Sequence, residues 1–93
     1  MSTARTVAIV VRGRVQGVGY RAWMRDEARA LGLRGHVRNQ PDGTVAAVVS
    51  GESGAVGRLL AACRRGPPGS RVEDVAESPS AEVPPAGFEI RYA

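Results

Sequence analysis

A glycine-rich segment contains the residues of this sequence that are best suited to bind an anion. GRVQGVGYR, from Gly13 to Arg21, follows a run of β-branched apolar residues and precedes a helix-like pattern, so it predicts a strand-to-helix loop. Successive N–H groups of such a loop can form a concave nest for an anion, and the first N–H groups of the helix lack intrahelical acceptors. A tight turn that needs glycine for positive φ is the simpler alternative.

Arg21 favours anion binding because of its expected place in the first helical turn. A cation there opposes the helix dipole, which costs up to about 1 kcal/mol if nothing offsets it. An anion held between the loop amides and the guanidinium would offset that cost. The planar guanidinium can also bond two phosphate oxygens at once. These residue types therefore predict a phosphate site.

Asn39 is the second residue with a predicted role in chemistry, and it ends a short strand pattern just before a turn. In a split β-α-β unit the two strands run parallel through a right-handed crossover, so their carboxyl ends meet at one edge of the sheet. Asn39 is therefore expected beside the glycine loop, where its amide could donate to and accept from a water molecule. A purely structural turn residue is the alternative.

Apolar periodicity predicts an α+β fold of the ferredoxin-like type, in the order β-α-β-β-α-β with a short additional C-terminal strand. Two helices would cover one face of an antiparallel sheet, and the second and third strands would form a hairpin across a PDG turn. Val72 and Val75 break strict alternation, which indicates a bulge. We expect strands over 6–12, 35–40, 44–51, 71–77 and 88–92, and helices over 20–31 and 56–63.

Length and composition predict one globular domain over residues 1–93. All 13 basic residues are arginines; eight lie within residues 1–40 beside two acids, so an anionic ligand fits this half. The lack of lysine excludes a Schiff-base lysine and a Walker A lysine. Cys63 is the single cysteine and no Cys/His cluster has metal-ligand spacing. Without a membrane-length apolar run or a secretion signal, a cytoplasmic location is expected.

At its glycine loop the sequence resembles the acylphosphatase family. Gly13 to Arg21 matches every fixed position of a family pattern close to G-x-V-Q-G-V-x-[FY]-R. GHVRNQPDGTVAAVVSG, from Gly35 to Gly51, is similar to a second family pattern, with His36 in place of the usual aromatic residue. GPPGSRVEDV and FEIRY resemble the closing segments of the family, so the resemblance covers nearly the whole chain.

The resemblance implies that the chain hydrolyses the carboxyl–phosphate anhydride of acyl phosphates, without a metal or another cofactor. Arg21 and Asn39 would be the catalytic residues, and Asn39 would orient the attacking water. Inorganic phosphate would be a product and an inhibitor. The phosphoryl group would be bound by Arg21 together with the loop amides, which are those of Gln16, Gly17, Val18, Gly19 and Tyr20.

The sequence leaves three alternative functions open. RNA-recognition domains share the ferredoxin-like plan, but they stack bases on aromatic residues that the strands over 6–12 and 44–51 lack. The acylphosphatase-like domain of a hydrogenase-maturation carbamoyltransferase is the second, and the end of the chain at Ala93 favours a freestanding enzyme instead. A phosphate-binding relic without turnover is the third, and the presence of both Arg21 and Asn39 argues against it. We therefore expect a monomer whose partner is a small acyl phosphate, with no nucleic acid and no membrane.

Three further residues are expected to have structural roles. Cys63 lies on the apolar stripe of the second helix, which favours the core over a nucleophile. The sequence places no acid or cysteine beside His36, which favours packing or the surface over metal ligation. Trp23 borders the apolar stripe of the first helix and is expected to pack against it.

Overall fold

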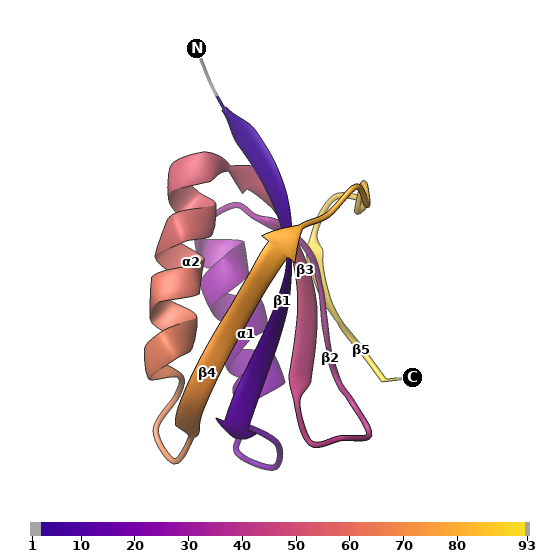
Figure 1. Cartoon of the computed structure of the whole chain (residues 1–93). Coiled ribbons are helices and arrows are strands. Elements are labelled where there is room, and N and C mark those ends of the chain that lie inside the picture. The colour runs from indigo at the N-terminus through magenta and orange to yellow at the C-terminus, as the bar shows by residue number, and fades with distance from the viewer. Residues whose placement is uncertain (1–2, 93) are drawn as a thin grey trace.

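A computed structural model describes residues 3–92, which form a five-stranded sheet with two helices packed on one face (Figure 1). This α+β, ferredoxin-like arrangement confirms the fold class predicted from the sequence. Neither described helix is long and apolar enough to cross a membrane. The elements are β1 (Ala4–Arg14), α1 (Tyr20–Ala30), β2 (Arg34–Asn39), β3 (Val45–Glu52), α2 (Ser53–Arg65), β4 (Arg71–Pro79) and β5 (Phe88–Arg91).

The strands lie in the order β4-β1-β3-β2-β5. β1 and β2 are both antiparallel to β3, so they point in the same direction, and their carboxyl ends lie at one edge as the topology argument predicts. β5 adds to β2 in parallel, which makes the sheet mixed and brings the end of β5 to that same edge. Three segments distant in sequence therefore converge near the glycine loop, which leaves β1 at this edge (Figure 1).

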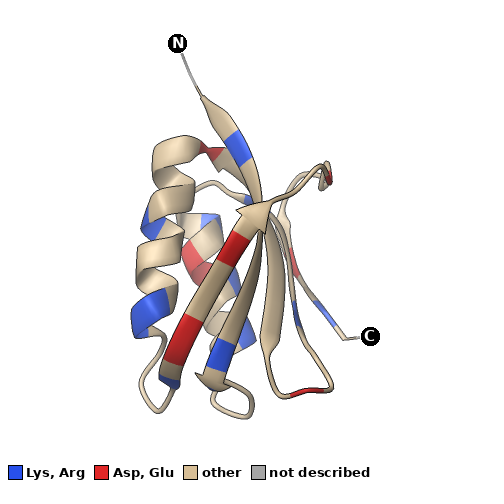
Figure 2. Cartoon of the chain, in the orientation of Figure 1, with Lys and Arg blue, Asp and Glu red and all other residues tan. Residues whose placement is uncertain are grey.

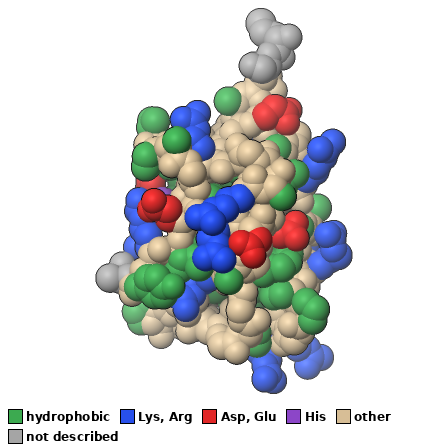
Figure 3. All heavy atoms as spheres, turned by 180° about the vertical axis from the view of Figure 1, so that it is seen from behind, with side chains coloured by type: hydrophobic (Ala, Val, Ile, Leu, Met, Phe, Trp, Pro, Cys, Tyr) green, Lys and Arg blue, Asp and Glu red, His purple; other side chains and the backbone are tan. Residues whose placement is uncertain are grey.

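The hydrophobic core lies between the helices and the sheet face that they cover. Val7, Ile9 and Val11 alternate inward along β1 and are almost fully buried. Both predicted helix stripes meet them: Met24 of α1 and Leu59 of α2 have no exposed surface. The solvent-facing side of α1 carries both basic and acidic side chains, whereas the charged residues of α2 are all arginines. The view from behind shows basic, acidic and apolar side chains mixed on one surface (Figure 3).

The predicted bulge lies where β4 pairs with β1. Arg12 pairs with Asp74 and Gly13 pairs with Val72, which leaves Glu73 as an extra residue on β4. The backbone of Gly13 has φ 124°, and a Cβ atom there would overlap the carbonyl oxygen of Arg71. Glycine is therefore required at the first position of the loop pattern for a reason of packing, not of chemistry.

The two helix N-termini differ in how they are capped. The Glu52 carboxylate precedes α2 and accepts hydrogen bonds from the N–H groups of Gly54 at 3.0 Å and Ala55 at 2.9 Å. These bonds lower the pKa of Glu52, since they stabilise its charged form. Gly19 caps α1 and has no side chain to offer, and the first turn of α1 contains no acid.

We expect Leu59→Ala to lower the free energy of unfolding by about 2–5 kcal/mol, because it removes a fully buried side chain and leaves a cavity. A denaturant titration followed by circular dichroism measures this loss. Arg58→Ala, at the exposed neighbouring position of α2, is the matched control and should change stability by less than about 0.5 kcal/mol. A near-neutral Leu59→Ala would contradict the packing described here.

Candidate active site

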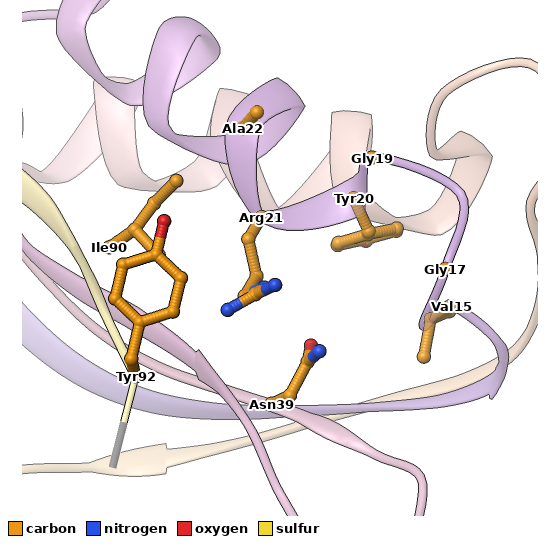
Figure 4. A pocket seen from close by; sticks show the side chains of 9 residues that line it. All are labelled: Val15, Gly17, Gly19, Tyr20, Arg21, Ala22, Asn39, Ile90 and Tyr92. Atoms are coloured by element: carbon orange, nitrogen blue, oxygen red, sulfur yellow. The ribbon is translucent and has the colours of Figure 1, made fainter.

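A hollow of about 180 Å³ opens between the glycine loop, the first turn of α1 and the ends of β2 and β5 (Figure 4). Its walls are formed by elements that the sheet topology brings to the same edge of the sheet. Its floor and walls are therefore assembled from three separate stretches of sequence: the loop with the first turn of α1, the end of β2, and the end of β5 with the residue that follows it. The lining residues are Val15, Gly17, Gly19, Tyr20, Arg21, Ala22, Asn39, Ile90 and Tyr92.

The N-terminus of α1 presents unpaired backbone donors at this hollow. The first hydrogen bond within the helix runs from Trp23 N–H to the carbonyl of Gly19, at 3.0 Å. The N–H groups of Tyr20, Arg21 and Ala22 consequently have no intrahelical acceptor, and the glycine cap supplies none. All three residues line the hollow, so the positive end of the helix dipole is directed at it.

Glycine is needed in the loop for its backbone conformation. Gly17 has φ 74° and Gly19 has φ 78°, both in the left-handed region. A Cβ atom on either residue would meet nothing within 4 Å, so space is not the constraint. These turns let successive backbone N–H groups curve toward one side, which is the geometry that favours an anion.

Arg21 and Asn39 face each other across the hollow. Arg21 extends from α1 and Asn39 from the end of β2, and the polar ends of both side chains point into the space between them (Figure 4). Within residues 3–92 the buried Oδ1 atom of Asn39 has no hydrogen-bond partner. Leaving such an atom unpaired costs about 1–3 kcal/mol, so this amide is suited to a polar ligand or a water molecule.

Tyr92 forms the outer wall of the hollow beside Arg21. The Arg21 guanidinium carbon lies 5.0 Å from the centre of the Tyr92 ring, a cation–π contact. Tyr92 as a whole is 81% exposed. Ile90, two residues earlier, lines the same wall and packs against the core. The last strand therefore contributes an apolar and aromatic boundary to a site that is otherwise polar.

The side chain of Gln16 ties the glycine loop to the hairpin between β2 and β3. Its Nε2 donates to the carbonyl of Gln40 at 2.8 Å and to the carbonyl of Thr44 at 2.9 Å. Those two residues also pair with each other, since Gln40 N–H donates to the Thr44 carbonyl at 2.8 Å. Gln16 thus holds the loop against the turn that immediately follows Asn39.

The turn itself is stabilised by Asp42. One carboxylate oxygen of Asp42 accepts from the N–H of Thr44 at 3.0 Å and from its hydroxyl at 2.6 Å. The hydroxyl bond and then the N–H bond hold the pKa of Asp42 below its usual range, so the carboxylate is charged at neutral pH. A charged Asp42 therefore keeps this turn closed. Because the turn directly follows β2, it also fixes the end of that strand.

Tyr20 anchors the first turn of α1 to α2. Its hydroxyl donates to the carbonyl of Cys63 at 2.7 Å, and its ring meets Trp23 edge-on with centroids 5.2 Å apart. Burial, as the main cause, raises the pKa of Tyr20 strongly, so the phenol stays protonated. Burial likewise raises the pKa of the Cys63 thiol to about 11. Both groups are packing elements, and Cys63 lies in the core as expected.

The structure brings most of the predicted site residues together. Arg21, Asn39, Gly17, Gly19 and Tyr20 all line the hollow. The other two predicted loop residues, Gln16 and Val18, do not line it: the Gln16 side chain bonds the hairpin, and Val18 packs against the core. Sequence reasoning missed Val15, Ala22, Ile90 and Tyr92, although the clean alternation of FEIRY placed Ile90 and Tyr92 on one face.

The sequence predicts a packing or surface role for His36, and the structure adds a contact that the sequence does not place. His36 does have an acidic partner, because its Nε2 lies 2.6 Å from Oε2 of Glu82, in the segment between β4 and β5. The two residues are 46 positions apart, so no local pattern could pair them. His36 alternates with Val37, which is in the core, and therefore lies on the sheet face away from the helices and away from the hollow.

Comparison with known proteins identifies relatives along nearly the whole chain. A family model described as acylphosphatase matches residues 7–90. An acylphosphatase of Azorhizobium caulinodans is 56% identical over 88 residues, covering 95% of this chain and 94% of the relative. Among solved structures, an acylphosphatase from Coxiella burnetii has a TM-score of 0.91 at 31% identity, covering 95% of this chain and 93% of its own. One from Bacillus subtilis has a TM-score of 0.89 at 34% identity, covering 97% of this chain and 100% of its own.

We expect Gln16→Leu to lower the free energy of unfolding by about 1–3 kcal/mol, because two hydrogen bonds are lost without a large change in side-chain volume. Hydrogen exchange at the Gln40 and Gly43 amides should accelerate more than exchange in the centre of β3. Arg14→Gln, at an exposed position near the end of β1, serves as the control. Unchanged stability and unchanged exchange in the hairpin would refute the role given to the Gln16 amide.

Proposed function

The chain belongs to the acylphosphatase family, and from that premise we propose that it hydrolyses acyl phosphates to a carboxylate and phosphate at the hollow lined by Arg21 and Asn39. The family match and the relatives support acylphosphatase activity. The observation that carries the assignment to this site is the meeting of uncapped helix donors, a guanidinium and an unpaired amide at one hollow.

In this proposal, the phosphoryl group is bound by Arg21 and by backbone N–H groups of the loop from Gln16 to Tyr20, of which Gly17, Gly19 and Tyr20 line the hollow. A phosphate monoester-like group carries close to two negative charges near neutral pH. The charge of the guanidinium and the positive end of α1 are directed at the same point, so they act together. Binding of this anion also removes the electrostatic penalty of having a cation in the first turn of α1.

Asn39 is proposed to position the attacking water. An amide can accept one hydrogen bond from the water through Oδ1 and donate another to a phosphate oxygen through Nδ2. The unpaired, buried Oδ1 provides the acceptor, and the closed turn after Asn39 keeps it in place. Holding the water close to phosphorus and in line with the leaving oxygen lowers the entropic part of the barrier.

The proposed reaction requires no general acid and no metal ion. Water attacks phosphorus, the bond from phosphorus to the carboxyl oxygen breaks, and the electron pair leaves with the carboxylate. That leaving group has a pKa near ~4, so it departs without a proton. The proton of the water passes to an oxygen of the substrate's own phosphate. Phosphoryl transfer then depends on positioning and electrostatic stabilisation, which the loop amides and Arg21 supply.

We expect phosphate release from benzoyl phosphate to continue unchanged in the presence of excess EDTA. Inorganic phosphate and vanadate should inhibit competitively, because they occupy the same donors as the substrate. The measurement is the initial rate at several substrate concentrations with and without each additive. A rate that EDTA abolishes and a divalent cation restores would contradict the mechanism.

Arg21→Ala and Asn39→Ala should separate binding from catalysis. Loss of charge-assisted hydrogen bonds in Arg21→Ala should raise the inhibition constant of phosphate at least about tenfold and reduce turnover. Asn39→Ala should reduce kcat by at least about 10²-fold, comparable with losing one preorganised polar group, while phosphate affinity stays nearly unchanged.

Two variants control that comparison. Arg25→Ala removes an arginine of α1 that does not line the hollow, and it should keep both constants near those of the parent. Arg21→Lys keeps the charge but loses the two-pronged geometry, so it should recover only part of the phosphate affinity. Normal kcat in Asn39→Ala, or normal phosphate binding in Arg21→Ala, would show that the roles are wrongly assigned even though the family is right.

A further inference from the structure

A second hollow, of about 320 Å³, lies on the sheet face that the helices leave uncovered. Its floor consists of small apolar side chains from the two central strands: Ala8 and Val10 of β1, and Ala46 and Val48 of β3. These residues pair across the strands and are half-buried although no helix covers them. Longer side chains from β2, β5 and the segment before β5 rise beside them, so the floor is low relative to this rim.

Two arginines stand side by side at the rim of this hollow. Arg38 of β2 and Arg91 of β5 are direct neighbours in the parallel register, and both are exposed. Each of the two strands carries a basic band (Figure 2). No carboxylate within residues 3–92 forms an ion pair with either guanidinium. Two adjacent like charges repel, and an anion placed between them would turn that repulsion into attraction.

The rest of the rim is also polar, but one of its side chains already has a partner within the protein. Glu82, on the same rim, has its carboxylate bonded to the buried His36 ring at 2.6 Å. Gln40 adds an amide near the end of β2. Polar recognition at this hollow therefore comes from its rim, on the side of Arg38 and Arg91.

The floor can offer only apolar contact, because the backbone groups of β1 and β3 are consumed by the sheet ladder. Among residues 3–92, no helix N-terminus or glycine loop lines this hollow. A fitting ligand thus has a small, flat apolar part for the floor and an anionic end for the guanidinium pair. The volume lies at the lower limit of about 300–1,000 Å³ that is usual for small-molecule sites.

We propose that this open-face hollow binds a small organic carboxylate. The apolar part of the ligand lies on the floor that includes Ala8 and Ala46, and its carboxylate is bonded to Arg38 and Arg91. The site is separate from the hollow at the loop, because alternation along the strands turns neighbouring residues to opposite faces. Asn39 and Ile90 line the first hollow, whereas Arg38 and Arg91 line the second. The proposal does not depend on the reaction assigned to Arg21 and Asn39.

Benzoate is the probe, and its binding to the whole chain is followed by ¹H–¹⁵N NMR with saturating inorganic phosphate present to occupy the loop site. Saturable shifts are expected at the amides of Ala8, Ala46, Arg38 and Arg91. Arg38→Gln and Arg91→Gln should each weaken benzoate at least about fivefold, since each removes one charged partner. Arg34→Gln changes another exposed arginine of β2 that does not line the hollow, and it should alter affinity less than twofold.

Ala46→Leu tests the floor without touching the charges. The larger side chain would occupy the space of the ligand, so benzoate shifts at Arg38 and Arg91 should disappear while the spectrum of the free protein stays well dispersed. The proposal is overturned if benzoate causes no saturable shift on this face, or if Arg34→Gln weakens it as much as Arg38→Gln. It is equally overturned if inorganic phosphate alone shifts these amides as strongly as benzoate does, because the apolar floor then plays no part.

Discussion

Two hydrogen bonds from the side-chain amide of Gln16 join the halves of the candidate site. The glycine loop belongs to the connection between β1 and α1, whereas Asn39 belongs to the hairpin of β2 and β3, and no strand pairing links the loop to that hairpin. Gln16 bonds two carbonyls, those of Gln40 and Thr44, that also face each other across the turn. In addition to the pairing of β1 with β3, a single side chain that does not itself line the hollow therefore bonds the loop directly to the hairpin that carries Asn39.

Much of the fold could be predicted because the buried residues follow two clear periods. Val7, Ile9 and Val11 repeat every second residue, and Val56, Leu59 and Leu60 repeat as a helix stripe, so element type and order follow directly. The ends of the strands could be predicted less well from the sequence. β1 continues to Arg14, because its hydrogen-bonded pairing extends past the run of apolar residues. The direction of β5 was not predicted either. Alternation in a four-residue strand indicates which residues share a face, but it does not identify the neighbouring strand.

The features of the candidate site that follow from the backbone and the sheet topology could be predicted from the sequence. Contacts between side chains and distant parts of the fold could be predicted less well. The convergence of Arg21 and Asn39 follows from parallel strands that end at one edge. The acceptors of Gln16 are backbone carbonyls, which carry no sequence signal. Tyr92 reaches Arg21 only because β5 joins β2, which depends on tertiary packing.

The two outer strands, β4 and β5, leave hydrogen-bonding groups exposed along the borders of the sheet. β4 is bulged at Glu73, carries further exposed acids at Asp74 and Glu77, and ends at Pro79, which has no N–H to donate. β5 is only four residues long. Short length, charge, a bulge and proline each hinder an outer strand from adding a strand of another molecule. The irregular alternation that marks β4 in the sequence is thus also a protection against aggregation between sheet edges.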